Sequence, residues 1–420
     1  LLRSELFSTE QLTQHARALA SNHVAGKKRQ PDYLLARLSA NARVLTMAHA
    51  MLASAVERGQ RVTPAGEWLL DNFYFLQEQI RMIRRHLPKR YSRGLPRLLT
   101  GPMAGYPRVY DIALELISHL DGRLDAKMLS SFIAAYQTVA TLRLSELWAL
   151  PLMLRLALIE NLRRVATRMM ADKHDRNAAA YWAGRMTEVA ENNPEDLILV
   201  MAELWRSQPP QSGAFAAELT RRIQGQGAAL ALPLTWLEER LSSLGLTSEH
   251  LVHAEGQRQA ADQVSVGNCI GSLHFVETMD WGEFVETTSA VDQALRKDPA
   301  DVYGRMDFTT RDRYRHAVED LANRSPMADD AVARQASGLA DAAASGYGPR
   351  HPASHVGYYL VDEGFPLLEQ AVGARVPVAA GLRRILGRFP LAVYAGGISA
   401  ATAAIAALLL TRSGAGATGM

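Results

Sequence analysis

The sequence predicts an all-α fold, a multi-helix array or bundle followed by one C-terminal transmembrane helix. Apolar residues recur every three or four positions along most of the 420 residues, and capping residues or prolines precede many of these runs. The sequence has no sustained alternation of apolar and polar residues between hairpin turns, so we expect no substantial sheet. Hydrophobic residues make up 48% and charged residues 21%, which excludes a wholly disordered or fibrous chain.

The best-marked helix lies between residues 64 and 87. One face of it is apolar, formed by Leu69, Phe73, Leu76, Ile80, Ile83 and Leu87. Thr63 is a suitable N-cap, and Pro64 suits the first helical position because its missing N–H would have no partner there. Capping residues mark three further predicted starts, at Ser8 with Gln11 in a capping-box pattern, at Asn193 and at Asp298.

Residues 144–165 are apolar on almost every side, which is typical of a helix buried in a core. Glu146, Arg155 and Glu160 interrupt this stretch, so no uncharged run in it approaches the roughly 18 residues that a membrane span needs. We therefore predict a buried central helix.

Breaks rich in proline and glycine indicate the domain organisation. They cluster at residues 88–108, 209–213 and 346–349. The predicted parts are an N-terminal helical segment (1–108), a central helical domain (109–345), a membrane-proximal helical segment (346–390) and a transmembrane helix (391–411).

The prediction of a transmembrane helix depends on residues 391–410, which carry no charge and reach the length of about 20 residues that a span needs. Arg383, Arg384 and Arg388 precede this stretch, and the arginine-rich side of a span stays in the cytoplasm. We therefore expect residues 1–388 to be cytoplasmic. No charged segment followed by an apolar one stands after Leu1, so we expect no signal peptide and a start within a longer reading frame.

Net charge and cysteine content exclude several kinds of partner and site. The formal charge of +3 is too small to indicate nucleic-acid binding, and no nucleic acid is expected as a partner. Cys269 is the single cysteine of the sequence, so an intrachain disulfide and a multi-cysteine zinc site are excluded.

Catalytic and cofactor-binding motifs are absent from the sequence. It has no phosphate-binding loop, and no pair of aspartates separated by one residue that could hold the divalent ion of a nucleotide sugar. The stretch Gly267-Asn268-Cys269-Ile270-Gly271 has the outline of a nucleophile elbow, but a packed helix or turn is favoured because no strand precedes it. No catalytic, cofactor-binding or metal-binding residue is therefore predicted.

Two histidine pairs have a spacing that could place both rings on one helical face. They are His250 with His253, and His351 with His355. Neither pair has an obvious third ligand, and Pro352 disturbs the second pair. Metal binding is therefore the less favoured interpretation of both.

Other polar and aromatic residues leave two interpretations open. One run of basic residues is either a solvated face or a contact for anionic lipid. It consists of Arg84, Arg85, Lys89, Arg90 and Arg93. Three tyrosines could stack on sugar rings, although core packing explains them at least as well, namely Tyr106, Tyr110 and Tyr303. A catalytic role has little support for Trp68, Asp71 and Glu78 of the best-marked helix, because carboxylates on a helix face are usually solvated.

Short stretches of distinctive sequence, which we call the word-like stretches, follow one another along nearly the whole chain. They are Pro64–Phe73, Glu78–Arg81, Leu87–Pro88, Gly105–Tyr110, Glu146–Ala149, Glu160–Arg164, Ser265–Asn268, Asp280–Glu286, Arg305–Arg315 and His355–Leu360. The most distinctive of them is Arg305-Met306-Asp307-Phe308-Thr309-Thr310-Arg311-Asp312-Arg313-Tyr314-Arg315. In this order the stretches resemble the N-terminal region of bacterial cyclic β-1,2-glucan synthases.

The resemblance implies a large glucosyltransferase of the bacterial inner membrane, in contact with its lipid. Such an enzyme uses UDP-glucose to build a cyclic β-1,2-glucan, and a divalent metal ion is expected for the full-length protein. The implied partners are downstream transferase and phosphorylase-like domains of the same polypeptide. Since those domains lie outside this chain, the segment itself is expected to be non-catalytic, to hold no cofactor and to act as scaffold or regulator. The alternative is a free-standing membrane-anchored helical adaptor protein.

Overall fold

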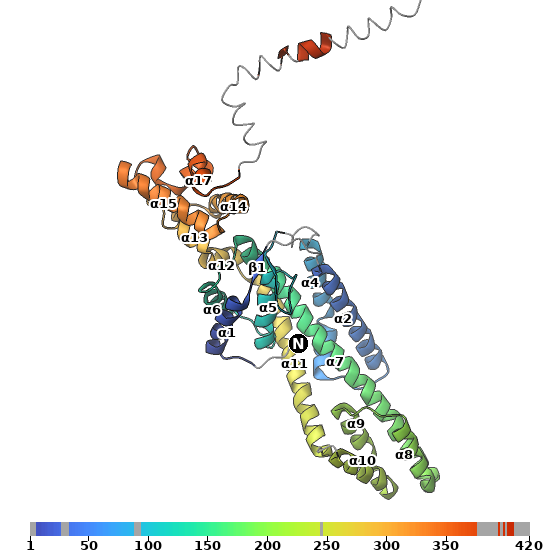
Figure 1. The fold of residues 1–420 in the computed structure, drawn as a ribbon. Helices are drawn as coiled ribbons and strands as arrows, with labels where there is room; N and C mark the ends of the chain where they lie inside the picture. Colours follow the sequence, from blue (N-terminus) through green and yellow to red (C-terminus); the bar gives the residue numbers. More distant parts are fainter. Residues whose placement is uncertain are drawn as a thin grey trace, which may run out of the picture. The chain divides into compact units, whose positions relative to one another are not determined.

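The computed structural model of the chain describes residues 6–26, 33–87, 94–243, 247–375, 394, 398–399 and 401–406. The predicted all-α class is confirmed, because the described residues are mostly helical (Figure 1). A single pair of two-residue strands is described, β1 (Ala25–Gly26) antiparallel to β2 (Arg97–Leu98). The chain divides into two compact units, which we call unit 1 (Leu1–Ser289) and unit 2 (Ala290–Met420). The predicted domain limits at residues 108, 345 and 390 stay predictions.

Each unit is built from helices joined by short connections. The helices of unit 1 are α1 (Thr9–Asn22), α2 (Leu34–Glu57), α3 (Pro64–Asp71), α4 (Phe73–His86), α5 (Arg108–His119), α6 (Ala126–Gln137), α7 (Leu144–Asn192), α8 (Leu197–Arg206), α9 (Gly213–Ile223), α10 (Ala231–Ser243), α11 (Ser248–Thr278) and α12 (Trp281–Thr288). Those of unit 2 are α13 (Ala290–Leu295), α14 (Phe308–Arg324), α15 (Asp329–Tyr347), α16 (Val356–Val361) and α17 (Phe365–Ala371). Short 3-10 turns cover Pro194–Asp196, Ala228–Leu230, Tyr303–Arg305 and Pro352–Ser354.

Local signals place some helix starts correctly and others not. Ser8 and Gln11 form both bonds of a capping box at α1, and the Thr63 hydroxyl accepts the Gly66 N–H at α3. The start at Asn193 leads into a 3-10 turn without a side-chain cap. The start predicted at Asp298 is wrong. The buried carboxylate of Asp298 instead accepts the backbone N–H groups four and five residues further along the chain, in a stretch that is not an α-helix.

The helix predicted over residues 64–87 is two helices, α3 and α4, which meet at Asn72. Asn72 leaves the helical conformation, with φ of −101° and ψ of 8°, and its side-chain amide donates to the Trp68 carbonyl at 2.9 Å. Such a local side-chain bond competes with the helical ladder. The predicted apolar face is confirmed, since every residue assigned to it is buried.

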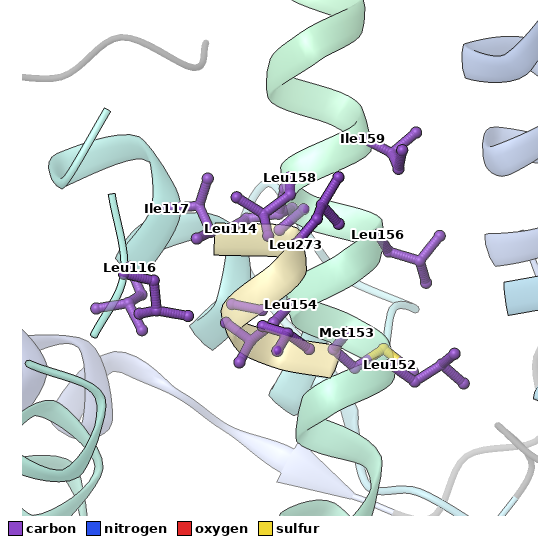
Figure 2. Packing of buried hydrophobic residues seen from close by; sticks show 14 of the residues in the cluster. Leu114, Leu116, Ile117, Leu152, Met153, Leu154, Leu156, Leu158, Ile159 and Leu273 are labelled. Atoms are coloured by element: carbon purple, nitrogen blue, oxygen red, sulfur yellow. The ribbon is translucent and has the colours of Figure 1, made fainter. Parts of the chain in front are cut away.

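The predicted buried central helix is the first half of α7. Leu154 and Leu158 of α7 are completely buried, and Figure 2 shows this segment packed beside Leu114 and Ile117 of α5 and Leu273 of α11. The helix contains 49 residues, a length of about 74 Å at 1.5 Å per residue, so it extends well beyond this core. Residues of its second half line the hollow described below.

The predicted C-terminal transmembrane helix is not supported and is corrected here. Among the described residues, no helix combines the length and the apolar character that crossing a membrane requires. Of the predicted span, the structure describes residues 394, 398–399 and 401–406. The remaining residues of the span, like Arg383, Arg384 and Arg388, lie outside the described part of the chain.

Unit 2 has a core of its own, formed by α13–α17. The distinctive stretch 305–315 supplies structural groups to this core. Asp307 caps α14 by accepting the Thr310 N–H, and Arg315 is completely buried on the carboxylate of Asp292 at 3.3 Å. The Arg315 guanidinium also lies over the Phe308 ring, 4.9 Å from its centroid. The stretch is therefore explained by folding of unit 2.

Candidate functional site

A large hollow of unit 1 lies where the α2–α3 turn faces α7, α9 and α11. Its volume is about 1270 Å³. Five basic and three acidic side chains line it: Arg61, Lys173, Arg176, Arg221, Arg222, Glu67, Glu218 and Glu255. We call it the basic hollow. A hollow of this size with an excess of basic groups suits a small anionic ligand.

A ladder of ion pairs joins the two long helices behind the basic hollow. Arg168 pairs with Asp262, and Arg258 of α11 donates to Asp172 of α7 at 2.9 Å. The last rung is Arg176 with Glu255, 3.4 Å apart, and this rung faces the hollow. Because the α7 members are four residues apart, they lie on one face of the helix. The ladder therefore fixes the register of α7 against α11 and the shape of the wall.

Burial and neighbouring charge shift the pKa of two groups in the hollow. Partial burial, followed by the charge of Arg176, lowers the pKa of the Lys173 ammonium below its usual value. Burial opposes ionisation of Glu218, but hydrogen bonds from Arg221 and Arg222 at 2.7 and 2.6 Å outweigh it, so the pKa of this carboxyl is lowered. Glu218 is therefore a charged carboxylate that neutralises much of the charge of the two arginines.

Lys173 and Arg61 add two further positive charges to the hollow. In the part of the chain that the structure describes, neither forms an ion pair with a carboxylate, and the Lys173 ammonium donates to the neutral Gln60 side chain at 2.7 Å. The Thr220 hydroxyl also lines the hollow and is buried without a hydrogen-bond partner among the described residues. Two cations and one hydroxyl donor can together bind a phosphate or carboxylate group.

The nucleophile-elbow interpretation of residues 267–271 is excluded, and the favoured packed helix is confirmed. Cys269 lies inside α11 and is completely buried, and the Asn161 amide donates to its sulfur at 3.2 Å. Burial raises the pKa of the Cys269 thiol to about 12. A thiol in this state is not a nucleophile at neutral pH.

Neither histidine pair considered from the sequence belongs to a group of three possible metal ligands among the described residues. His250 and His253 are exposed on α11, whereas His351 accepts the Ala353 backbone N–H and His355 pairs with Asp298 at 2.8 Å. The structure forms a different group, in which His15, Glu115 and His119 hold ligand atoms close enough to share one metal ion. Sequence reasoning missed it. The sequence contains one signal of this group, the spacing of Glu115 and His119 by one helical turn. The third residue, His15, joins them only when the chain is folded.

The other residues considered from the sequence fall into three groups. Tyr110 and Tyr303 are buried, and the Tyr303 hydroxyl donates to Asp292 at 2.7 Å, so core packing explains both, while Tyr106 is half-buried. Five of the residues considered are exposed on α3 and α4, namely Trp68, Asp71, Glu78, Arg84 and Arg85. Outside the described residues lie Lys89, Arg90 and Arg93.

Two further buried ion pairs explain polar residues of the word-like stretches. Arg108 holds Glu146 through two hydrogen bonds, one of them 2.9 Å long, and Arg37 holds Glu160 through two bonds of 3.0 Å. Glu146 also accepts the Arg143 backbone N–H and so caps α7. These groups join α7 to α2 and α5 and belong to the frame of unit 1.

Comparison with known proteins shows a relative of this chain. No family model matches the chain. It is 30% identical over 379 residues to cyclic beta-(1,2)-glucan synthase NdvB of Rhizobium meliloti (strain 1021), and the match covers 89% of this chain and 13% of that protein. The chain thus spans a small part of the length of the curated relative that it matches. It is a homologue of the N-terminal region of that protein, as the word-like stretches predict.

Proposed function

We propose that this chain, as a homologue of the N-terminal region of a cyclic β-1,2-glucan synthase, is the helical N-terminal segment of such an enzyme. In this proposal the segment supports UDP-glucose-dependent synthesis of cyclic β-1,2-glucan as a scaffold or regulator. The observation that carries the proposal is the extent of the match, which takes in 89% of this chain but 13% of the relative. Most of a synthase would therefore lie in other parts of the polypeptide.

Buried charged pairs support the scaffold role. The carboxylates of Glu146 and Glu160 are almost completely buried and are bound by arginines of α5 and α2. Buried ion pairs contribute little net stability, but they penalise every arrangement that leaves a charge without its partner. They suit a segment whose task is to hold one geometry.

The basic hollow supports the regulatory role. It offers Lys173 and Arg61 to an anion, such as the phosphate groups of a nucleotide, without any catalytic group being required. The glucosyl transfer, with UDP-glucose and a divalent metal ion, belongs in this proposal to the downstream transferase domain. The phosphorylase-like domain is the second partner within the polypeptide, and the bacterial inner membrane is the location, with residues 1–388 on its cytoplasmic side.

Glucan synthesis by membranes that contain the full synthase tests this proposal. We expect the variant with Arg61→Glu and Lys173→Glu together to change the rate of glucan formation from UDP-glucose at least fivefold. The matched control reverses two exposed arginines away from the hollow and from the basic run, Arg43→Glu and Arg123→Glu, and should stay within twofold of the parent protein. Equal rates for all three proteins would refute the regulatory role of the hollow. A stop codon directly after Met420 would refute the synthase assignment and favour the adaptor.

A further inference from the structure

A cluster of two imidazoles and one carboxylate lies between α1 and α5, away from the residues that line the basic hollow. His15 belongs to α1, and Glu115 and His119 are four residues apart on α5, so both point from the same face of that helix. The Nε2 atom of His15 lies 2.9 Å from Oε2 of Glu115, and Nε2 of His119 lies 3.4 Å from the same oxygen. All three ligand atoms are within 4.8 Å of one another.

These distances match the coordination shell of a transition-metal ion. Zinc binds imidazole nitrogen and carboxylate oxygen at about 2.0–2.2 Å, and a tetrahedron with such bonds separates its ligand atoms by about 3.3 Å. Two of the three separations are 2.9 and 3.4 Å. An ion could therefore be held by small side-chain rotations of His15 and His119, with the backbone of both helices unchanged.

We propose that His15, Glu115 and His119 form a binding site for one divalent transition-metal ion, with Zn²⁺ as the favoured ion. Two nitrogen ligands favour zinc over magnesium and calcium, which prefer oxygen. Three protein ligands leave a fourth position for water or another group, as in zinc sites that are open to a ligand. This inference does not depend on the proposed function in glucan synthesis.

The surroundings of the cluster prepare it for an ion. The Glu115 carboxylate lies between the two imidazoles, and one of its oxygens contacts both rings. The Phe7 ring stacks on His119 with 3.8 Å between ring centroids, and the Phe7 backbone N–H donates to the His119 carbonyl at 3.2 Å. Phe7 therefore fixes the His119 ring and covers one side of it with apolar surface.

The opposite side of the cluster is accessible. The side chains of His15 and Glu115 are 26% and 34% exposed, whereas that of His119 is 7% exposed. An ion can thus enter from solvent past the two accessible ligands and meet the buried ring last. The capping box at Ser8 holds the start of α1, and with it His15, in place.

A second His–carboxylate pair, at the end of α1 and on α5, provides a matched control. His23, the residue that follows α1, contacts Asp111 of α5 at 3.1 Å, and its other ring nitrogen contacts the Tyr136 hydroxyl at 2.8 Å. Both of its nitrogens are thus occupied by groups of the protein. The variant His23→Gln therefore removes an imidazole beside the same helix pair without touching the proposed site.

Metal titration of the whole 420-residue chain, purified without a histidine tag, tests the proposal. Zn²⁺ is titrated in competition with a chromophoric chelator, and Co²⁺ absorption reports coordination geometry. We expect one Zn²⁺ per chain, a loss of affinity of at least tenfold in Glu115→Gln and in His15→Asn, and affinity within threefold of the parent in His23→Gln. His15→Asn is the safer variant, because this side chain is partly exposed, and circular dichroism verifies that each variant is folded.

Two results would overturn the site. One is the absence of saturable binding of Zn²⁺ or Co²⁺ by the folded parent chain. The other is stoichiometric binding that Glu115→Gln and His15→Asn leave unchanged, because the ion would then be held elsewhere.

Discussion

Replacing Glu160 by glutamine removes one charge at the junction of α2 and α7 while keeping the size of the side chain. Glu160 is 2% exposed and accepts hydrogen bonds from Arg37 at two positions, from Asn41 at 2.6 Å and from Arg163 at 3.2 Å. Removing one member of a buried pair costs about 3–5 kcal/mol, because the other charge is left uncompensated. Arg37 is 31% exposed and regains some water, so we expect a loss of about 2–3 kcal/mol in the free energy of unfolding.

The pH dependence follows from the direction of the Glu160 pKa shift. Burial opposes ionisation, but the bonds from Arg37 and Asn41 outweigh it, so the pKa in the folded chain lies below the usual value of 4.5. The stabilisation is therefore present above pH 4.5 and is lost as the pH falls through the pKa of the folded state. The difference between parent and Glu160→Gln should be largest at pH 7 and should shrink towards pH 3.

Urea unfolding followed by tryptophan fluorescence measures this difference. All six tryptophans lie within residues 1–289, so the signal reports on unit 1 alone. Glu78→Gln on the exposed face of α4 is the control and should change the free energy of unfolding by less than about 0.5 kcal/mol. The reasoning is refuted if Glu160→Gln behaves like this control at pH 7, or if its loss is as large at pH 3 as at pH 7.

Three further predictions concern buried groups. Iodoacetamide should leave Cys269 of the native chain unmodified at pH 8 and alkylate it in urea, because burial raises its pKa to about 12; rapid native labelling would contradict this. Gly122→Ala should lose about 2 kcal/mol or more in urea unfolding, since Gly122 has φ of +80° and a Cβ would lie 2.5 Å from the Cys269 sulfur; an unchanged midpoint would argue against it. Arg315→Met should destabilise unit 2 by about 1–3 kcal/mol in thermal melting followed by circular dichroism, because Asp292 would lose a buried partner but keep Arg296 at 2.6 Å; a melting curve like the parent's would refute it.

Local spacing in the sequence is enough to predict the fold class and much of the core. The buried face of α3 and α4, the caps at Ser8 and Thr63, and the buried first half of α7 all follow from interactions between residues within a few positions. The break at Asn72 was not predicted, because the helical pattern of apolar residues continues through it. The transmembrane helix was predicted from length and absence of charge, and the described helices do not include one.

The candidate sites depend on contacts between distant residues and could not be predicted in the same way. The basic hollow brings Arg61, Lys173 and Thr220 together from three separate elements. None of these residues belongs to a sequence motif that marks a binding site. The metal cluster joins His15 to Glu115 across 100 residues, and no spacing rule links them before the chain is folded.

The most direct test of the central proposal measures glucose transfer by the 420-residue chain alone. The purified chain is incubated with UDP-glucose labelled in the glucose and with Mg²⁺ or Mn²⁺, and the full synthase in membranes is the positive control. As a scaffold or regulatory segment, the chain should release no UDP and incorporate no label into glucan, while the full synthase forms labelled cyclic β-1,2-glucan. Label incorporation or UDP release by the chain alone would contradict the account and make this segment a catalyst in its own right.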